Sequence, residues 1–296
     1  MNIHGIIPAM ITPLDKEQRL HRTATISLTR YLLQQSIHGL FILGTNGEFH
    51  MLSEEEKIAF TEMVSHEANS KVPLIVGAGG NSTEEVIRLS HKLEQAGADV
   101  LSVITPYFIQ PSQKELIDHY KTIAANTTLP ILIYNIPSKT GVSIEPEAVK
   151  ELASIENIVG IKDSSGNFEN INQYIQMTND QDFVVLAGTD SLILQTLQAG
   201  GTGAVAATAN IIPEQIASIY KHWKSGNIEA AERAQESVNP LRDLFKLGTI
   251  PSVVKKAVEV NGYEAGPPKS PVAAADSTIA QKLSNVLREL KSERNE

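Results

Sequence analysis

Cysteine is absent from this 296-residue chain. Its absence excludes disulfide bonds, zinc sites with cysteine ligands and catalysis by a thiol. The chain also lacks an apolar run of about 18 residues and a signal-like N-terminus, so we expect no membrane span and take the cytoplasm as the default location. The length is sufficient for one large domain with a substantial core.

Positive charge is also scarce. Lysine and arginine number 25 against 34 aspartate and glutamate residues, which leaves a net charge of −9. Because no basic face or basic tail is visible, we predict small-molecule partners, no nucleic acid and no membrane. The eight histidines fall mostly in helical stretches and form no close ligand set with acidic residues, so we expect no metal and no cofactor.

Short β-branched runs alternate with helical segments along most of the chain. The runs cover residues 5–12, 39–44, 74–77, 99–106, 131–137, 158–162, 183–190 and 203–208. Several intervening segments begin with serine and carry apolar residues at helical spacing, namely residues 53–69, 82–96 and 112–126. Eight such units predict an α/β fold of the (β/α)8 TIM barrel type, and a doubly wound open sheet is the alternative.

The pattern changes after about Lys224, where only helices are expected. These cover residues 228–247, 251–261 and 277–291, and a loop rich in glycine and proline occupies residues 262–271. We therefore predict a barrel over residues 1–224 that carries the active site. Residues 225–296 are predicted to form a C-terminal helical extension packed on the barrel.

Lys162 lies at the end of an apolar run, beside Val159 and Ile161. Burial there would disfavour the ammonium ion and lower the pKa of the amine, which would make it a nucleophile at neutral pH. The natural use of such a lysine is a Schiff base with a carbonyl substrate. The alternative is that Lys162 only ends the strand and extends its amine to solvent.

Polar residues at other strand ends suit the same chemistry. Tyr134 ends the preceding strand, and because neighbouring strands lie about 4.8 Å apart, it could transfer protons at Lys162. It could equally be a packed aromatic residue. The turn that contains Thr45 and Asn46 offers amide and hydroxyl donors for a carboxylate, although a plain turn would have the same sequence.

The seventh and eighth strands end in further polar groups. Gly188, Thr189 and Asp190 follow the seventh run, and Thr208 and Asn210 follow the eighth. At the rim of a barrel these side chains can bind substrate hydroxyls. Neither loop has a nearby arginine or a long glycine string, so a phosphate site is less favoured there.

Three motifs occur in order on the second, fifth and sixth predicted strands, at residues 44–48, 134–137 and 160–163. Together they resemble the dihydrodipicolinate synthase and N-acetylneuraminate lyase family, and the resemblance extends over nearly the whole chain. It implies a (β/α)8 barrel with a helical C-terminal segment, usually assembled as a homotetramer.

The resemblance also implies roles for single residues. It makes Lys162 the Schiff-base lysine for pyruvate or another 2-keto acid, and Tyr134 the proton relay. Thr45 and Asn46 match the pair that binds the keto-acid carboxylate, although the family more often has threonine at the second position. The backbone carbonyl of Val205 would complete the pyruvate pocket.

Two departures from the family pattern concern the second substrate. Synthases that make dihydrodipicolinate have an arginine at the position of Lys139, where it binds the carboxylate of aspartate semialdehyde. A lysine cannot reproduce that two-point contact. They also extend a second relay tyrosine from a neighbouring subunit, at the position of Phe108, and a phenyl ring cannot transfer protons. Tyr107 would point the other way.

The favoured hypothesis from these residues is a lyase that cleaves a 2-keto-3-deoxy sugar acid of about six carbons into pyruvate and a short aldehyde. Ser164, Thr189 and Asp190 are its expected hydroxyl partners. Lys139 could bind a second acidic group on the aldehyde or be a solvated loop lysine. The alternatives are a dihydrodipicolinate synthase, which condenses pyruvate with aspartate semialdehyde, and a non-catalytic keto-acid sensor.

Overall fold

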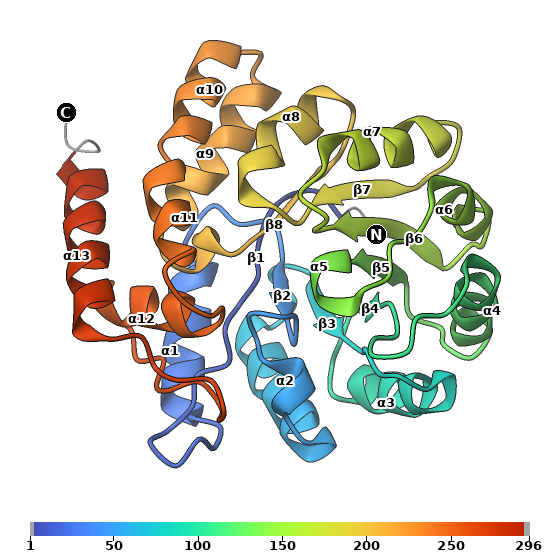
Figure 1. Cartoon of the computed structure of the whole chain (residues 1–296), viewed down its shortest axis with the longest axis horizontal. Helices are drawn as coiled ribbons and strands as arrows, with labels where there is room; N and C mark the ends of the chain where they lie inside the picture. The colour runs from blue at the N-terminus through green and yellow to red at the C-terminus, as the bar shows by residue number, and fades with distance from the viewer. Residues whose placement is uncertain (1–2, 293–296) are drawn as a thin grey trace.

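A computed structural model describes residues 3–292 and has eight parallel strands at its centre (Figure 1). The strands are β1 (Gly5–Pro8), β2 (Leu40–Ile42), β3 (Leu74–Gly77), β4 (Val100–Ile104), β5 (Ile131–Asn135), β6 (Ile158–Asp163), β7 (Val184–Ala187) and β8 (Gly203–Ala206). They follow one another around the sheet, and β1 pairs with β8. Between β1 and β2 the barrel is closed by one bridge, Ala9 to Phe41. The predicted TIM barrel is confirmed.

Helices alternate with the strands and form the outer ring (Figure 1). They are α1 (Arg22–Leu33), α2 (Glu54–Ala68), α3 (Thr83–Gln95), α4 (Gln113–Ala124), α5 (Pro137–Thr140), α6 (Pro146–Ala153), α7 (Phe168–Met177), α8 (Ile193–Gln198) and α9 (Pro213–Lys224). Ser53 and Ser112 form capping boxes at the starts of α2 and α4, as the serine-led pattern predicts. No helix within residues 3–292 is both long enough and apolar enough to cross a membrane.

Most of the predicted strands extend too far at their C-terminal ends. The run predicted over residues 5–12 ends as a strand at Pro8, and the run over residues 183–190 ends at Ala187. The residues just beyond β1 are nevertheless as buried as the strand itself, including Met10 and Ile11. Apolar composition reports burial, not the hydrogen-bonded ladder, so it cannot distinguish a strand from a buried loop at the barrel mouth.

The barrel interior is filled by a separate set of buried side chains. They include Ile7, Phe41, Ile75, Val100, Leu132, Leu186 and Val205. Side chains alternate along a strand, so Tyr134 points inward two residues after Leu132. Lys162 is in register with both Tyr134 and Leu186, which places its side chain inward as well.

The C-terminal part consists of helices, but residues 228–247 are not the single helix that we predicted. They form α10 (Ile228–Glu236) and α11 (Asn239–Phe245). Pro240 lies in the first turn of α11, and a proline has no backbone N–H to continue a preceding helix. The last two helices, α12 (Ser252–Val260) and α13 (Ser277–Ser292), agree with prediction to within one residue at each end. In Figure 1, α13 lies at the outer edge beside α11 and α12.

Candidate active site

A cavity of about 500 Å³ opens at the carboxyl ends of the strands. Ten of the predicted site residues line it, namely Thr45, Asn46, Tyr134, Lys139, Lys162, Ser164, Gly188, Thr189, Asp190 and Val205, whereas the buried Thr208 and Asn210 do not. The ten come from five strands or the loops that follow them. A parallel barrel brings these ends together on one face, so residues distant in sequence form one site.

Lys162 is the most deeply placed charged group in this cavity. Its side chain is 4% exposed, and its Nζ lies 3.9 Å from the centroid of the Tyr134 ring and 4.2 Å from that of Phe41. Burial lowers the pKa of the Lys162 amine below its ordinary value, and the nearby Tyr134 and Asp190 oppose that shift. Burial therefore shifts this amine toward its neutral, nucleophilic form relative to an exposed lysine.

The residue after Lys162 anchors the strand end from the other side. The buried Asp163 carboxylate accepts hydrogen bonds from Asn135 Nδ2 at 2.7 Å and Asn170 Nδ2 at 2.8 Å. It also accepts from the backbone N–H of Ser165 at 3.0 Å. Since neighbouring side chains on a strand point to opposite faces, this outer network holds the backbone from which Lys162 extends inward.

Tyr134 connects Lys162 with the loop after β2. Its hydroxyl lies 3.1 Å from Thr45 Oγ1, and its ring meets Phe41 edge to face. Either hydroxyl can donate in the Tyr134 and Thr45 pair. A proton can therefore be taken up or released at the Tyr134 oxygen and passed toward the loop, which is the property that a proton relay requires.

The loop at residues 44–47 is a tight turn with its own hydrogen bonds. Gly47 N–H donates to the Gly44 carbonyl at 3.0 Å, and Thr12 Oγ1 donates to the Gly47 carbonyl at 2.7 Å. A Cβ at Gly44 would lie 2.5 Å from the Phe41 ring, so only glycine fits there. The turn thus holds Thr45 and Asn46 at the cavity wall.

Gly188 provides clearance beside the lysine. A Cβ at Gly188 would lie 2.0 Å from Ser164 Oγ and 3.0 Å from Lys162 Cε. Ser164 Oγ donates to the Gly188 carbonyl at 3.2 Å, which ties the ends of β6 and β7 together. Ser164 and Thr189 are both only partly buried and line the cavity, where their hydroxyls face the substrate space.

Asp190 differs from its expected role as a partner for substrate hydroxyls. Its buried carboxylate already accepts from Thr208 N–H at 2.8 Å, Thr208 Oγ1 at 2.5 Å and Ala207 N–H at 3.2 Å. Its carbonyl accepts from Gln235 Nε2 at 2.9 Å. Asp190 therefore joins the loops after β7 and β8 to α10, and its negative charge acts on Lys162 from within the wall.

Two basic residues that were not predicted as site residues line the same cavity. Arg242 lies on α11 and Lys246 is the residue that caps its C-terminus; with Lys139 on α5 they form what we call the cationic rim. Lys246 pairs with Asp243 at 2.7 Å, whereas Arg242 and Lys139 form no ion pair within residues 3–292. The spacing of four residues, which puts Arg242 and Lys246 on one helix face, was the only signal in the sequence.

Phe108 does not line the cavity of its own chain. It is 91% exposed and has a backbone φ of 79°, which residues other than glycine rarely adopt. Tyr107 points differently, since its ring meets Phe49 and its backbone N–H donates to Asn81 Oδ1 at 2.8 Å. The predicted divergence of these two aromatic side chains is therefore present.

The described residues contain no group of three histidine, cysteine, aspartate or glutamate side chains that could hold a metal ion. The barrel and its buried lysine define the protein as an enzyme of the pyruvate-dependent class I lyases and synthases. The profile of the Dihydrodipicolinate synthetase family matches residues 2–290. The chain therefore belongs to this family.

Individual relatives cover the chain almost completely. It is 39% identical over 286 residues to a 4-hydroxy-tetrahydrodipicolinate synthase of Archaeoglobus fulgidus, covering 97% of this chain and 98% of the relative. A synthase of the same name from Bacillus velezensis is 36% identical over 291 residues, covering 98% and 100%. These names fit the synthase alternative better than the favoured hypothesis of sugar-acid cleavage.

Solved structures give the same family. The dihydrodipicolinate synthase of Thermotoga maritima superimposes with a TM-score of 0.94 at 32% identity, covering 97% of this chain and 98% of that chain. A prophage protein of the family from E. coli K12, solved in complex with pyruvate, has a TM-score of 0.93 at 32% identity with the same coverage. The fold of this chain is thus shared with these structures.

Placing an amine inside the barrel is expected to reduce stability. Burial lowers the pKa of Lys162 in the folded chain. Between that pKa and about 10.4, the unfolded chain therefore binds more protons than the folded chain. The free energy of unfolding consequently decreases as the pH falls through this range. Lys162→Met should raise the melting temperature at pH 7 by about 2–4 °C, the shift that roughly 1 kcal/mol produces in a large domain.

The gain should shrink as the pH rises past about 10.4, where the amine becomes neutral in the unfolded chain as well. Lys256→Met is the matched control, because Lys256 lies outside the barrel and pairs with Glu259 at 2.5 Å. Calorimetric scans at several pH values measure both variants. If the melting temperature of Lys162→Met at pH 7 is equal to or lower than that of the wild type, burial of the Lys162 amine does not reduce the stability of the fold.

Proposed function

We propose that this enzyme condenses pyruvate with aspartate semialdehyde, the reaction of the 4-hydroxy-tetrahydrodipicolinate synthases. The observation that carries the proposal is the cationic rim, which faces the cavity that contains Lys162 and Tyr134. Aspartate semialdehyde has a carboxylate that these cations can bind. The names of the relatives support the same assignment.

The pyruvate half of the reaction uses the buried residues. The neutral Lys162 amine adds to the carbonyl carbon of pyruvate. Tyr134 gives its proton to the departing hydroxyl group, so that water leaves, a protonated imine remains and Tyr134 is left as the phenolate. Thr45, Asn46 and the Val205 carbonyl hold the pyruvate end of this adduct. Tyr134 then accepts a proton from the methyl carbon, and the electrons of that C–H bond move into the imine, which gives an enamine nucleophile.

The aldehyde half uses the cationic rim. The enamine attacks the aldehyde carbon, and the new alkoxide takes a proton from Tyr134. Lys139 can supply a positive charge to the semialdehyde carboxylate but cannot contact both oxygens in one plane. Arg242 carries the planar guanidinium that can do so. In this proposal α11 supplies the arginine that the Lys139 position lacks.

Cleavage of a 2-keto-3-deoxy sugar acid is the second candidate. Phe108 favours it, because this chain has no hydroxyl at the position of the second relay tyrosine. Ser164 and Thr189 also favour it, since their hydroxyls line the cavity and could bind sugar hydroxyls. A short neutral aldehyde, however, would leave the cationic rim without a partner.

An aldehyde panel tests the two candidates. With pyruvate held constant, kcat/KM for aspartate semialdehyde should exceed that for glyceraldehyde by about tenfold or more. Arg242→Gln should lower kcat/KM for aspartate semialdehyde by about 10- to 100-fold, the range expected for lost hydrogen bonds to a charged group. The KM for pyruvate should not change. Initial-rate kinetics with both substrates varied provide the measurement.

Arg233→Gln is the matched control, since Arg233 is an exposed arginine on α10 and does not line the cavity. If glyceraldehyde turns over faster than aspartate semialdehyde, cleavage of sugar acids is the better assignment. If both Arg242→Gln and Arg233→Gln behave like the wild type, the cationic rim has no role in binding the aldehyde.

The assembly is a separate expectation. Phe108 and Ile109 are adjacent, apolar and 91% and 73% exposed. Adjacent exposed apolar side chains are typical of a surface that contacts another protein. They support the proposed homotetramer, with a second copy of this chain as the partner, and the molecular mass in solution measures it.

A further inference from the structure

Lys255 and Glu48 form an ion pair that is sealed from solvent. Lys255 Nζ lies 2.6 Å from Glu48 Oε1, and the two side chains are 1% and 0% exposed. Lys255 belongs to α12 in the C-terminal part, whereas Glu48 follows the turn after β2. The pair therefore joins two regions that are distant in sequence, and neither residue lines the catalytic cavity.

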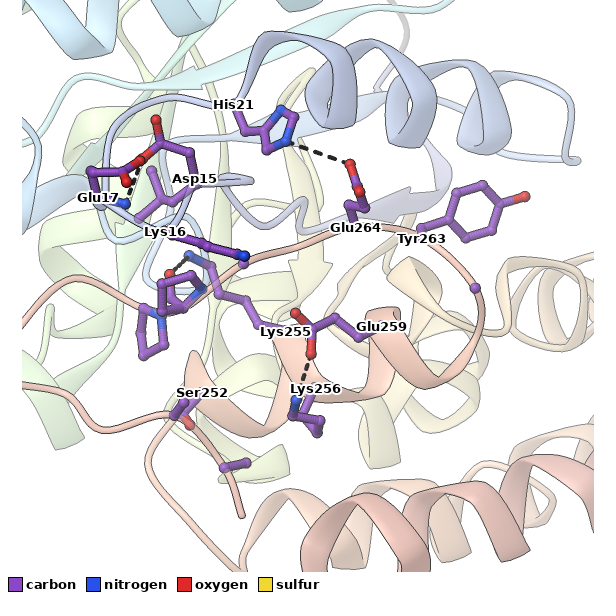
Figure 2. A pocket seen from close by; sticks show the side chains of 17 residues that line it. Asp15, Lys16, Glu17, His21, Ser252, Lys255, Lys256, Glu259, Tyr263 and Glu264 are labelled. Carbon is purple, nitrogen blue, oxygen red and sulfur yellow. Dashed lines mark hydrogen bonds and ion pairs between the residues drawn. The ribbon is translucent and has the colours of Figure 1, made fainter. Parts of the chain in front are cut away.

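The pair lies behind a second cavity of about 750 Å³, between the loop after β1 and the C-terminal residues. Figure 2 shows Lys255 on the wall of this cavity, with the next residue, Lys256, turned to Glu259. Several of the ionic groups here already have partners, as His21 has in Glu264 and Lys256 in Glu259. The cavity alone therefore does not indicate a ligand.

A buried ion pair is weak support for stability. Two charges lose their hydration when they are buried, and well-packed apolar side chains of similar size often stabilise a fold as much or more. Burial lowers the pKa of Lys255, and the adjacent Glu48 opposes that shift. Because the site is so unfavourable for isolated charges, we expect the pair to have a role in holding the neighbouring backbone in place.

The contacts of the pair bind the C-terminal loop to the barrel mouth. Lys255 Nζ donates to the Pro267 carbonyl at 2.9 Å, and Glu48 Oε2 accepts from Lys269 N–H at 2.7 Å. Lys269 Nζ in turn pairs with Glu56 on α2 at 2.6 Å. Glu48 is thus held from two sides by residues of the C-terminal part.

Glu48 also follows directly on the active-site turn and is hydrogen-bonded to it. It adopts the left-handed conformation, with φ 58° and ψ 30°, which a residue with a side chain enters only under constraint. Its N–H donates to the Thr45 carbonyl at 3.2 Å. Thr45 Oγ1 then meets the Tyr134 hydroxyl at 3.1 Å. A continuous series of contacts therefore leads from Lys255 to Tyr134.

We infer that Glu48 and Lys255 are positioning residues: their buried ion pair holds the turn that presents Thr45 and Asn46 to the substrate carboxylate. The C-terminal part thereby completes the active site of the barrel. The inference rests on the proposed function, because it takes that turn as the binding site for the carboxylate of pyruvate.

The double variant Glu48→Gln/Lys255→Met separates positioning from stability. It leaves no buried charge without a partner, so the melting temperature should stay near that of the wild type. The KM for pyruvate should nevertheless rise by about tenfold or more, because the turn loses the contacts that fix it. The single variant Lys255→Met leaves Glu48 buried and unpaired, and it should be the least stable of the set.

Glu48→Asp is the second test, and it applies even if the double variant fails to fold. It keeps the charge but shortens the side chain by one methylene group, which moves the carboxylate away from Lys255. The KM for pyruvate should therefore again rise. Lys256→Met is the control, since it removes a neighbouring lysine from the same helix without touching the turn. Its KM for pyruvate should equal that of the wild type.

The possible failures are distinguishable. Borohydride with pyruvate should label Lys162 in the wild type, and an unlabelled wild type ends both the proposed function and this inference. A labelled wild type, together with an unchanged pyruvate KM in the folded double variant or in Glu48→Asp, overturns this inference alone. In that case the ion pair contributes only to stability.

Discussion

Lys162→Ala is expected to abolish covalent trapping of pyruvate. Borohydride reduces an imine to a stable amine, so the wild type treated with pyruvate should carry a mass adduct on the peptide that contains Lys162. The variant has no amine at the cavity floor, and its turnover should fall by about 10⁴-fold or more, as for other enzymes that lose their nucleophile. Peptide mass spectrometry and initial rates measure the two effects.

Lys162→Arg sharpens this experiment, because a guanidinium keeps the positive charge but does not deprotonate in proteins. It should fail to trap pyruvate as completely as alanine does. Lys256→Ala controls for general labelling of lysines, since its amine lies outside the catalytic cavity. Trapping that persists in Lys162→Ala on another residue would show that the nucleophile lies elsewhere.

Tyr134→Phe is expected to lower kcat by about 10²- to 10⁴-fold, the usual contribution of a general acid and base. The phenyl ring retains the contacts with Lys162 and Phe41, so the fold and the environment of the amine should change little. Only the hydroxyl that meets Thr45 is lost. Imine formation should slow but still reach completion.

Exchange of the pyruvate methyl protons in deuterated water isolates the affected step, because it reports enamine formation without an aldehyde. That exchange should nearly cease in Tyr134→Phe. Tyr107→Phe is the matched control, since Tyr107 is outside the catalytic cavity and should exchange at the wild-type rate. Exchange at the wild-type rate in Tyr134→Phe would assign the proton transfer to another group.

The barrel was predictable because each of its units is local. A β-branched run, a turn residue and a serine-capped helix recur at short range, and such repeats permit few topologies. The division between α10 and α11 was also local in origin, and Pro240 was its visible signal. The exact strand ends were not predictable, since residues such as Met10 remain buried after the ladder has ended.

The inner site was predictable for a related reason. Lys162 and Tyr134 lie at the carboxyl ends of strands and Thr45 follows one, and the closure of a barrel brings such residues to one rim. The orientation of single side chains was not predictable. The carboxylate of Asp190 binds Thr208, a residue 18 positions later, and no local pattern indicates that contact.

The outer part of the site depends on tertiary packing. Arg242 reaches the cavity only because α11 packs over the barrel mouth, and nothing in the sequence of that helix specifies where it packs. As long as the position of Arg242 was unknown, Lys139 was the only cation expected to bind the carboxylate of aspartate semialdehyde, and a lysine replaces an arginine poorly there. The sequence therefore favoured sugar-acid cleavage. The synthase relatives and the cationic rim together reverse that preference.

The junction between β1 and β2 has a consequence for solvent access. A single β-bridge between Ala9 and Phe41 closes the barrel there, with hydrogen bonds from Met10 N–H to the Phe41 carbonyl and from His38 N–H to the Ile6 carbonyl, both at 2.8 Å. The Phe41 ring is also one of the two that shield the Lys162 amine from water. Separation of the two strands would hydrate the amine and favour its ammonium form. Because acid also favours the ammonium form, we expect acidification to favour separation of β1 from β2.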